Sequence, residues 1–159
     1  MSQPLDGRLF GPRNHCFGCS PDHPIGLHLT FDRDGDDVVT RFVPSERHQG
    51  APGIMHGGLV ATVADELAAW VIVALLGKFG FTASFSSRLL RPVRIGTELV
   101  GRGRLVRDRR RIVDVAVELS QAGEPAYSGE FRFALLDQAA SERLLGAPLP
   151  EDWTRFVRT

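Results

Sequence analysis

Residues 57–76 read GGLVATVADELAAWVIVALL, a long and mostly apolar stretch. It is apolar on all sides except at two consecutive acids, Asp65 and Glu66. A helix that is hydrophobic all round is normally buried on most of its sides. Gly77 and Gly80 follow the stretch, and a glycine just after the last turn is a common helix stop. We therefore predict one long buried helix over residues 57–76.

The apolar part of this stretch, residues 59–76, is also long enough to span a bilayer. Each acid at a bilayer centre would cost roughly 2.5–3.5 kcal/mol, so we expect a buried helix and no membrane association. The N-terminus has no basic-then-apolar signal pattern, which predicts a cytoplasmic protein. The 19 basic and 19 acidic residues give no net charge, which argues against a nucleic-acid partner.

Stretches that resemble β-strands lie on both sides of the predicted helix. In the clearest, Val113, Val115, Val117 and Leu119 alternate with more polar residues, the pattern of a half-buried strand. An antiparallel sheet with one face to cover would use the helix as its cover. We predict a single α+β domain over 1–159, with an irregular segment 1–26 and a C-terminal tail 138–159 docked by Trp153 and Phe156. The predicted strands are 27–31, 38–43, 82–90, 97–106, 113–120 and 126–136.

The two acids on the apolar helix are the first candidate functional residues. A carboxylate is costly to remove from water unless it is paired or hydrogen-bonded. Consecutive residues point about 100° apart on a helix, so at least one of Asp65 and Glu66 should face a cleft. The pair either marks a solvent edge or an arginine contact, or it supplies a general base or nucleophile.

The start of the helix is the second candidate element. His56, Gly57 and Gly58 precede the apolar run, where backbone N–H groups lack intrahelical partners. This is either a plain helix start or an oxyanion hole that a ligand approaches closely over glycine. His56 and Asp65 are nine residues apart, roughly 13 Å along a helix. If both act on one substrate, two subunits must share the site, so the catalytic hypothesis predicts a homodimer.

Three segments together resemble a known family. HQGAPGIMHGGLVATVADELAAW (48–70) is similar to the hot-dog-fold thioesterases of the phenylacetate-pathway (PaaI-like) group, in which an acid stands nine positions after the histidine of an HGG motif. FTASFSSRLLRPV (81–93) resembles the strand that follows their helix, and CFGCSPDHPIGLHL (16–29) the opening of some members. The resemblance implies a hot-dog fold, with a curved antiparallel sheet of five to six strands around one helix. It also implies dimers or tetramers and hydrolysis of acyl-CoA without a cofactor.

The resemblance also implies roles for single residues. Asp65 would be the base or nucleophile, the Gly57 amide would polarise the thioester carbonyl, and His56 would place the thioester. Thr82 matches the hydroxyl residue that binds the attacking water or Asp65, with Ser84 as a rival.

Further residues are candidates for binding the substrate. Gln49 stands in the loop where some relatives carry Asn, and Gly58 lets a ligand approach the backbone. Arg88 and Arg91 either contact the phosphates of CoA or form a solvated rim. Two alternatives to hydrolysis stay open: a hot-dog hydratase or dehydratase, and a non-catalytic acyl-CoA binder.

Cys16 and Cys19 have the spacing of metal ligands, and His15, His23 and His28 lie nearby in the sequence. A Cys₂His₂ zinc site could be assembled from them. The alternatives are a redox pair and a tight turn that packs its thiols near the acyl site, and a disulfide is not expected in the cytoplasm. We expect the turn, with no metal.

Overall fold

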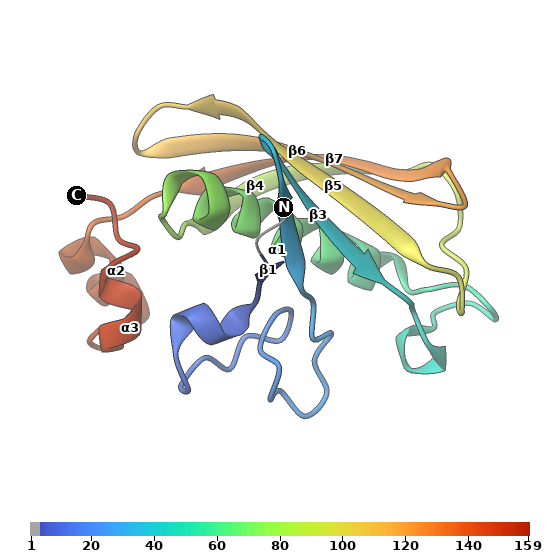
Figure 1. Ribbon diagram of the computed structural model, residues 1–159, viewed down its shortest axis with the longest axis horizontal. Helices are drawn as coiled ribbons and strands as arrows, with labels where there is room; N and C mark the ends of the chain where they lie inside the picture. Colours follow the sequence, from blue (N-terminus) through green and yellow to red (C-terminus); the bar gives the residue numbers. More distant parts are fainter. Residues whose placement is uncertain (1–3) are drawn as a thin grey trace.

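The computed structural model describes residues 4–159, and within them the chain folds as one curved antiparallel sheet with a long helix against its concave face (Figure 1). The sheet has seven strands in the order β1-β2-β3-β5-β6-β7-β4. The helix α1 spans Gly57–Leu76. The strands are β1 (Pro4–Leu5), β2 (Phe31–Asp34), β3 (Asp37–Phe42), β4 (Phe81–Leu89), β5 (Leu99–Asp108), β6 (Ile112–Gln121) and β7 (Glu124–Ala134).

The predicted hot-dog architecture is confirmed, and α1 has the predicted bounds. The six predicted strands correspond to β2–β7, but residues 27–30 were wrongly assigned to a strand, because β2 begins only at Phe31. The reason is that these residues pair with a turn instead of a strand. The N–H groups of Leu27 and Leu29 donate to the carbonyls of Phe17 and Gly18, both at 2.9 Å.

The two ends of the chain contain more structure than expected. The segment predicted to be irregular, 1–26, holds β1 and a 3₁₀-helix at Gly7–Phe10, while its first three residues lie outside the described part. The tail forms α2 (Gln138–Leu145) and α3 (Glu151–Thr154). Ring centroids of Trp153 and Phe156 lie 4.5 and 4.7 Å from that of Phe10, so the tail docks on the N-terminal segment.

Two glycines on β5 let α1 lie close to the sheet. A Cβ added to Gly101 would come within 2.8 Å of the Leu67 side chain, and one on Gly103 within 2.7 Å of Val71. Leu67 and Val71 are completely buried. Although α1 is long and apolar enough to cross a membrane, this packing makes it the core helix of the domain. The close packing of α1 on β5 therefore determines where Asp65 and Glu66 lie relative to the sheet.

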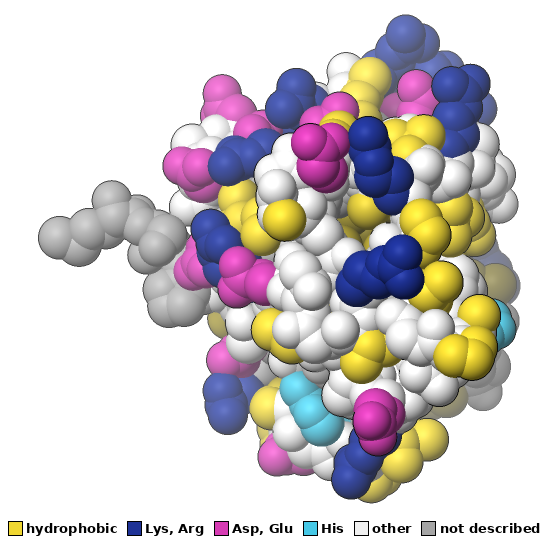
Figure 2. Space-filling view, turned by 90° about the vertical axis from the view of Figure 1, so that its right-hand side faces the viewer, with side chains coloured by type: hydrophobic (Ala, Val, Ile, Leu, Met, Phe, Trp, Pro, Cys, Tyr) yellow, Lys and Arg dark blue, Asp and Glu magenta, His cyan; other side chains and the backbone are white. Residues whose placement is uncertain are grey.

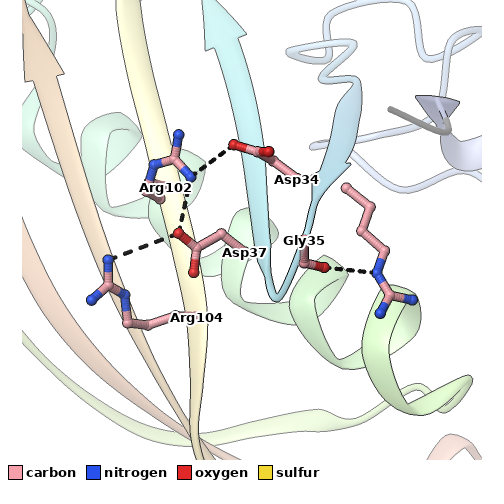
Figure 3. Close-up of polar contacts among 6 residues, drawn as sticks. Asp34, Gly35, Asp37, Arg102 and Arg104 are labelled. Carbon is pink, nitrogen blue, oxygen red and sulfur yellow. Dashed lines mark hydrogen bonds and ion pairs between the residues drawn. The ribbon is translucent and has the colours of Figure 1, made fainter. Parts of the chain in front are cut away.

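Surface ion pairs join the β2–β3 hairpin to β5, near the edge of the sheet opposite β4 (Figure 3). Arg102 on β5 donates to Asp34 and Asp37, at 3.1 and 2.9 Å, and so ties the β2–β3 hairpin to its neighbouring strand. Arg33 reaches from the same hairpin to the carbonyl of Ala74 near the end of α1, at 3.2 Å. Exposed pairs of this kind contribute little stability, about 0–1 kcal/mol each, so the hairpin depends mainly on its buried residues.

Candidate active site

Asp65 lies in the middle of α1 and faces the edge strand β4. The Thr82 hydroxyl donates a hydrogen bond to Asp65 Oδ1 at 2.8 Å. Thr82 pairs with the buried Phe133 of β7, which places it on the face of the sheet that α1 covers. Burial raises the pKa of Asp65 above its ordinary value, and the bond from Thr82 partly opposes this shift. A partly dry carboxylate with one fixed donor is suited to accept a proton from a water molecule.

Ser84, the rival of Thr82, is not brought to Asp65. The pairing of β4 with β7 shifts its register between Thr82 and Ser84. Ser84 pairs with the exposed Arg132, and so lies on the outer face of the sheet. A β-bulge adds a residue and turns the following side chains to the opposite face. Arg88, four residues further on, also lies on this outer face and not beside α1.

The start of α1 has the arrangement of an anion-binding helix end. The Gly58 N–H donates to His56 Nδ1 at 3.0 Å, and the Leu59 and Val60 N–H groups donate to the His56 carbonyl. Among residues 4–159 the Gly57 N–H has no acceptor. Because Nδ1 accepts a hydrogen bond, a neutral His56 carries its proton on Nε2. The positive end of α1 therefore presents one unused amide beside an imidazole N–H.

A groove of about 440 Å³ opens at this helix start, between residues 50–56 and 89–93. Figure 2 shows the end of the molecule at which α1 begins, where hydrophobic side chains lie between arginines. Arg91 lines the groove and is held by the carbonyl of Pro125, at 2.8 Å, and by Glu124, at 3.2 Å. Gln49 accepts a hydrogen bond from the Gly53 N–H at 2.9 Å, and so holds the loop that forms one wall.

Within one chain, Asp65 and the start of α1 lie apart, and we call them the two half-sites of the predicted shared site. Asp65 does not line the groove beside Gly57, and nine positions of α1 separate it from His56. Strand β4 runs past both half-sites at the edge of the sheet, with no further strand beyond it in the described part of the chain. Phe85, Leu89 and Leu90 leave 53, 56 and 50% of their surfaces exposed there.

Glu66 points away from β4, toward the N-terminal turn that holds both cysteines. Its Oε1 lies 3.1 Å from Cys16 Sγ, and burial together with this neighbour raises the pKa of Glu66 to about 8. A hydrogen bond from the Cys19 thiol, helped by backbone N–H groups, lowers the pKa of Cys16 to about 5. The Cys19 pKa is raised by the same hydrogen bond and by burial. No local pattern predicts this contact, because 50 residues separate Glu66 from Cys16.

Comparison with known proteins finds similarity to one family. Residues 52–126 match the model of the thioesterase superfamily. A comparison with curated protein sequences finds no match. Among solved structures, a thioesterase superfamily protein is 28% identical with a TM-score of 0.69, and the match covers 76% of this chain and 60% of that one.

Two further structures share the fold. A hypothetical thioesterase from Streptococcus pneumoniae TIGR4, crystallised with coenzyme A, is 24% identical over 64% of this chain and 82% of its own, with a TM-score of 0.60. Thioesterase superfamily member 2 of zebrafish is 19% identical over 72% of this chain and 89% of its own, with a TM-score of 0.65. The chain has the hot-dog fold and is similar to proteins of the thioesterase superfamily.

Proposed function

We propose that this protein hydrolyses an acyl-CoA thioester to the free acid and CoA, as a member of the PaaI-like group. The observation that carries the proposal is the half-buried Asp65 with Thr82 fixed on its Oδ1 at 2.8 Å. Similarity to the thioesterase superfamily supports the reaction class, and the unused Gly57 amide supplies the second element that thioester hydrolysis requires.

In the proposed reaction, Asp65 removes a proton from a water molecule whose oxygen attacks the thioester carbon. Negative charge then develops on the carbonyl oxygen, where the Gly57 N–H and the positive end of α1 stabilise it. The C–S bond breaks as the tetrahedral intermediate collapses, and the proton held by Asp65 passes to the departing thiolate of CoA. A direct attack by the Asp65 carboxylate would use the same groups. No cofactor takes part in either route.

The proposal requires a homodimer, because each chain holds the two half-sites apart. A second copy placed against β4 would bring its helix start to Asp65, and the reverse contact would complete a second site. The exposed Phe85, Leu89 and Leu90 support this arrangement, because burial of apolar side chains is the main driving force of most protein association. Two such dimers could form a tetramer.

We place the CoA portion along the groove beside the helix start. The related Streptococcus pneumoniae protein was crystallised with coenzyme A, which supports CoA as the ligand. Arg91 lies on the groove wall and can bind a phosphate, Gln49 holds the facing loop, and Gly58 keeps the backbone open. The proposal gives no role to Ser84 or Arg88, since both lie on the outer face of the sheet.

The test is thiol release from a panel of short, long and aromatic acyl-CoAs by wild type and by Asp65→Asn. We expect Asp65→Asn to lose most turnover while it still binds CoA. Asp114→Asn is the matched control, because Asp114 lies on the outer face of the sheet, paired with Arg132. Tight acyl-CoA binding without thiol release by the wild type would favour a non-catalytic binder instead.

Assembly is tested separately by sedimentation at assay concentrations. We expect Phe85→Asp to shift the protein toward monomer and to remove activity together with the dimer. Leu144→Asp is the control, because Leu144 is 60% exposed but lies on α2, outside the sheet and its edge strand. A wild type that is active as a strict monomer would contradict the shared site.

A further inference from the structure

The two cysteines and Glu66 form a cluster that the proposed hydrolysis does not use. One donor atom from each of Cys16, Cys19 and Glu66 lies within 4.8 Å of the other two. Cys19 is buried and Cys16 is partly buried, and both are free thiols. Two sulfur atoms and a carboxylate oxygen therefore converge from an N-terminal turn and the central helix.

The turn fixes the sulfur of Cys16 before any ion is bound. The Ser20 N–H donates to the Cys16 carbonyl at 3.1 Å and closes the turn, and the Cys16 thiol donates to Glu66 Oε1 at 3.1 Å. The buried Asn14 holds the turn from behind, because its Oδ1 accepts from the Cys16 N–H at 3.1 Å and its Nδ2 donates to the Gly7 carbonyl at 2.9 Å. A sulfur held in this way needs little rearrangement to ligate a metal, which it does as the thiolate.

Because Gly18 has no side chain, the Glu66 side chain can lie against the turn and reach the two sulfurs. A Cβ at position 18 would lie only 2.1 Å from Glu66 Cγ and 2.2 Å from its Cδ. Any other residue would therefore displace the carboxylate or the turn. The close approach needs glycine, and it aims a carboxylate from the core helix at the thiol pair.

We propose that Cys16, Cys19 and Glu66 bind one zinc ion, with water as the fourth ligand. In a tetrahedral zinc site with Zn–S near 2.3 Å and Zn–O near 2.1 Å, neighbouring donors lie about 3.5–3.8 Å apart. The present separations, 3.1 Å for Cys16 to Glu66 and within 4.8 Å for the others, need adjustments of about 1 Å or less. Soft thiolates with one hard oxygen favour Zn²⁺ over copper(I), magnesium or calcium.

The histidines near the cysteines in the sequence do not complete the site. The cluster within the described residues contains the two cysteines and Glu66, and His28 Nε2 contacts the His23 carbonyl instead. The ion would fasten the turn to α1 next to Asp65. The proposal does not depend on acyl-CoA hydrolysis, and binding is measured without substrate.

The test is titration of the freshly reduced, metal-stripped protein with Co²⁺ and then Zn²⁺. We expect one Co²⁺ per chain with thiolate-to-cobalt charge-transfer absorption, displaced by Zn²⁺, and a melting temperature that rises with free zinc. Loss of a second-shell partner typically weakens metal sites by about 10–100-fold, so loss of a direct ligand in Cys16→Ser or Glu66→Gln should weaken binding by at least about 100-fold. Gly18→Ala should also weaken it.

His23→Ala and Asp65→Asn are the matched controls, because both change a potential ligand close to the site without touching the cluster. They should bind cobalt as the wild type does, and circular dichroism of every variant checks that it is folded. Absence of the charge-transfer band in reduced, folded wild type would overturn the proposal, and would leave the thiols as a redox pair or a packed turn. Unchanged binding in both ligand variants would overturn it as well.

Discussion

Asp65 and Glu66 are consecutive on α1, yet they meet two different regions of the molecule. Asp65 faces the open edge at β4, where its partner is the Thr82 hydroxyl. Glu66 faces the N-terminal turn, where its neighbours are thiols. Burial raises the pKa of both, and that of Glu66 to about 8. A raised pKa therefore does not distinguish the two acids, whereas their neighbouring groups and the open edge strand beside Asp65 do.

The largest expected difference between the two acids is in turnover. Removal of a general base typically lowers the rate by about 10²–10⁴-fold, so we expect a loss in this range for Asp65→Asn. Glu66→Gln should keep kcat within about tenfold of wild type, because Glu66 does not face β4 or the groove. Both variants are measured by thiol release from the best acyl-CoA. A folded Glu66→Gln as inactive as Asp65→Asn would reverse the assignment.

The next effect concerns stability on the Glu66 side. Gly18→Ala would place a Cβ 2.1 Å from Glu66 Cγ, and overpacking of this kind costs about 1–3 kcal/mol. Gly50→Ala is the milder comparison and should cost less, because its nearest contact would be His56 Cα at the longer distance of 3.1 Å. Urea unfolding of metal-free protein with a chelator measures both. Equal stability of Gly18→Ala and wild type would show that the turn does not pack against Glu66 as described.

Much of the architecture could be predicted from local patterns. The apolar stretch 57–76 forms a stable helix in water only when it is buried. The alternation of apolar and polar residues in β6 predicts which face of this strand points inward. The prediction of a strand over residues 27–30 was wrong for a specific reason. Buried leucines alternate there as in a strand, but their N–H groups donate to the carbonyls of a turn. Alternation reports which side chains are buried, and does not report what the backbone pairs with.

The candidate site was predictable only in part, for reasons of distance and register. The family motif predicted the roles of Asp65, Gly57 and Thr82, and the structure brings Thr82 to Asp65. Thr82 and Ser84 should share a face of a regular strand, and the bulge that separates them has no signal in a single sequence. The contact of Glu66 with Cys16 depends on tertiary folding, which local spacing does not encode.

The smallest expected effect is a shift in the pH dependence on the Asp65 side. Asp65 acts as a base only when ionised, so kcat rises as the pH rises through its pKa. The hydrogen bond from Thr82 lowers that pKa, so Thr82→Val should move the acidic limb of the profile to higher pH. Hydrogen bonds to charged groups contribute about 1.5–3 kcal/mol, less where solvent reaches them, and about 1.4 kcal/mol equals one pKa unit. We therefore expect a shift of up to about one unit, with turnover at high pH kept within about tenfold.

Two matched variants separate this effect from a general loss of packing at the edge strand. Thr82→Ser keeps the hydroxyl and should restore most of the wild-type profile, although it lacks the methyl group. Ser84→Ala should leave the profile unchanged, because Ser84 lies beyond the bulge on the outer face of the sheet. If Ser84→Ala moved the acidic limb and Thr82→Val did not, the register of β4 would differ in the active dimer. Asp65 would then take its hydroxyl partner from the other face of the strand.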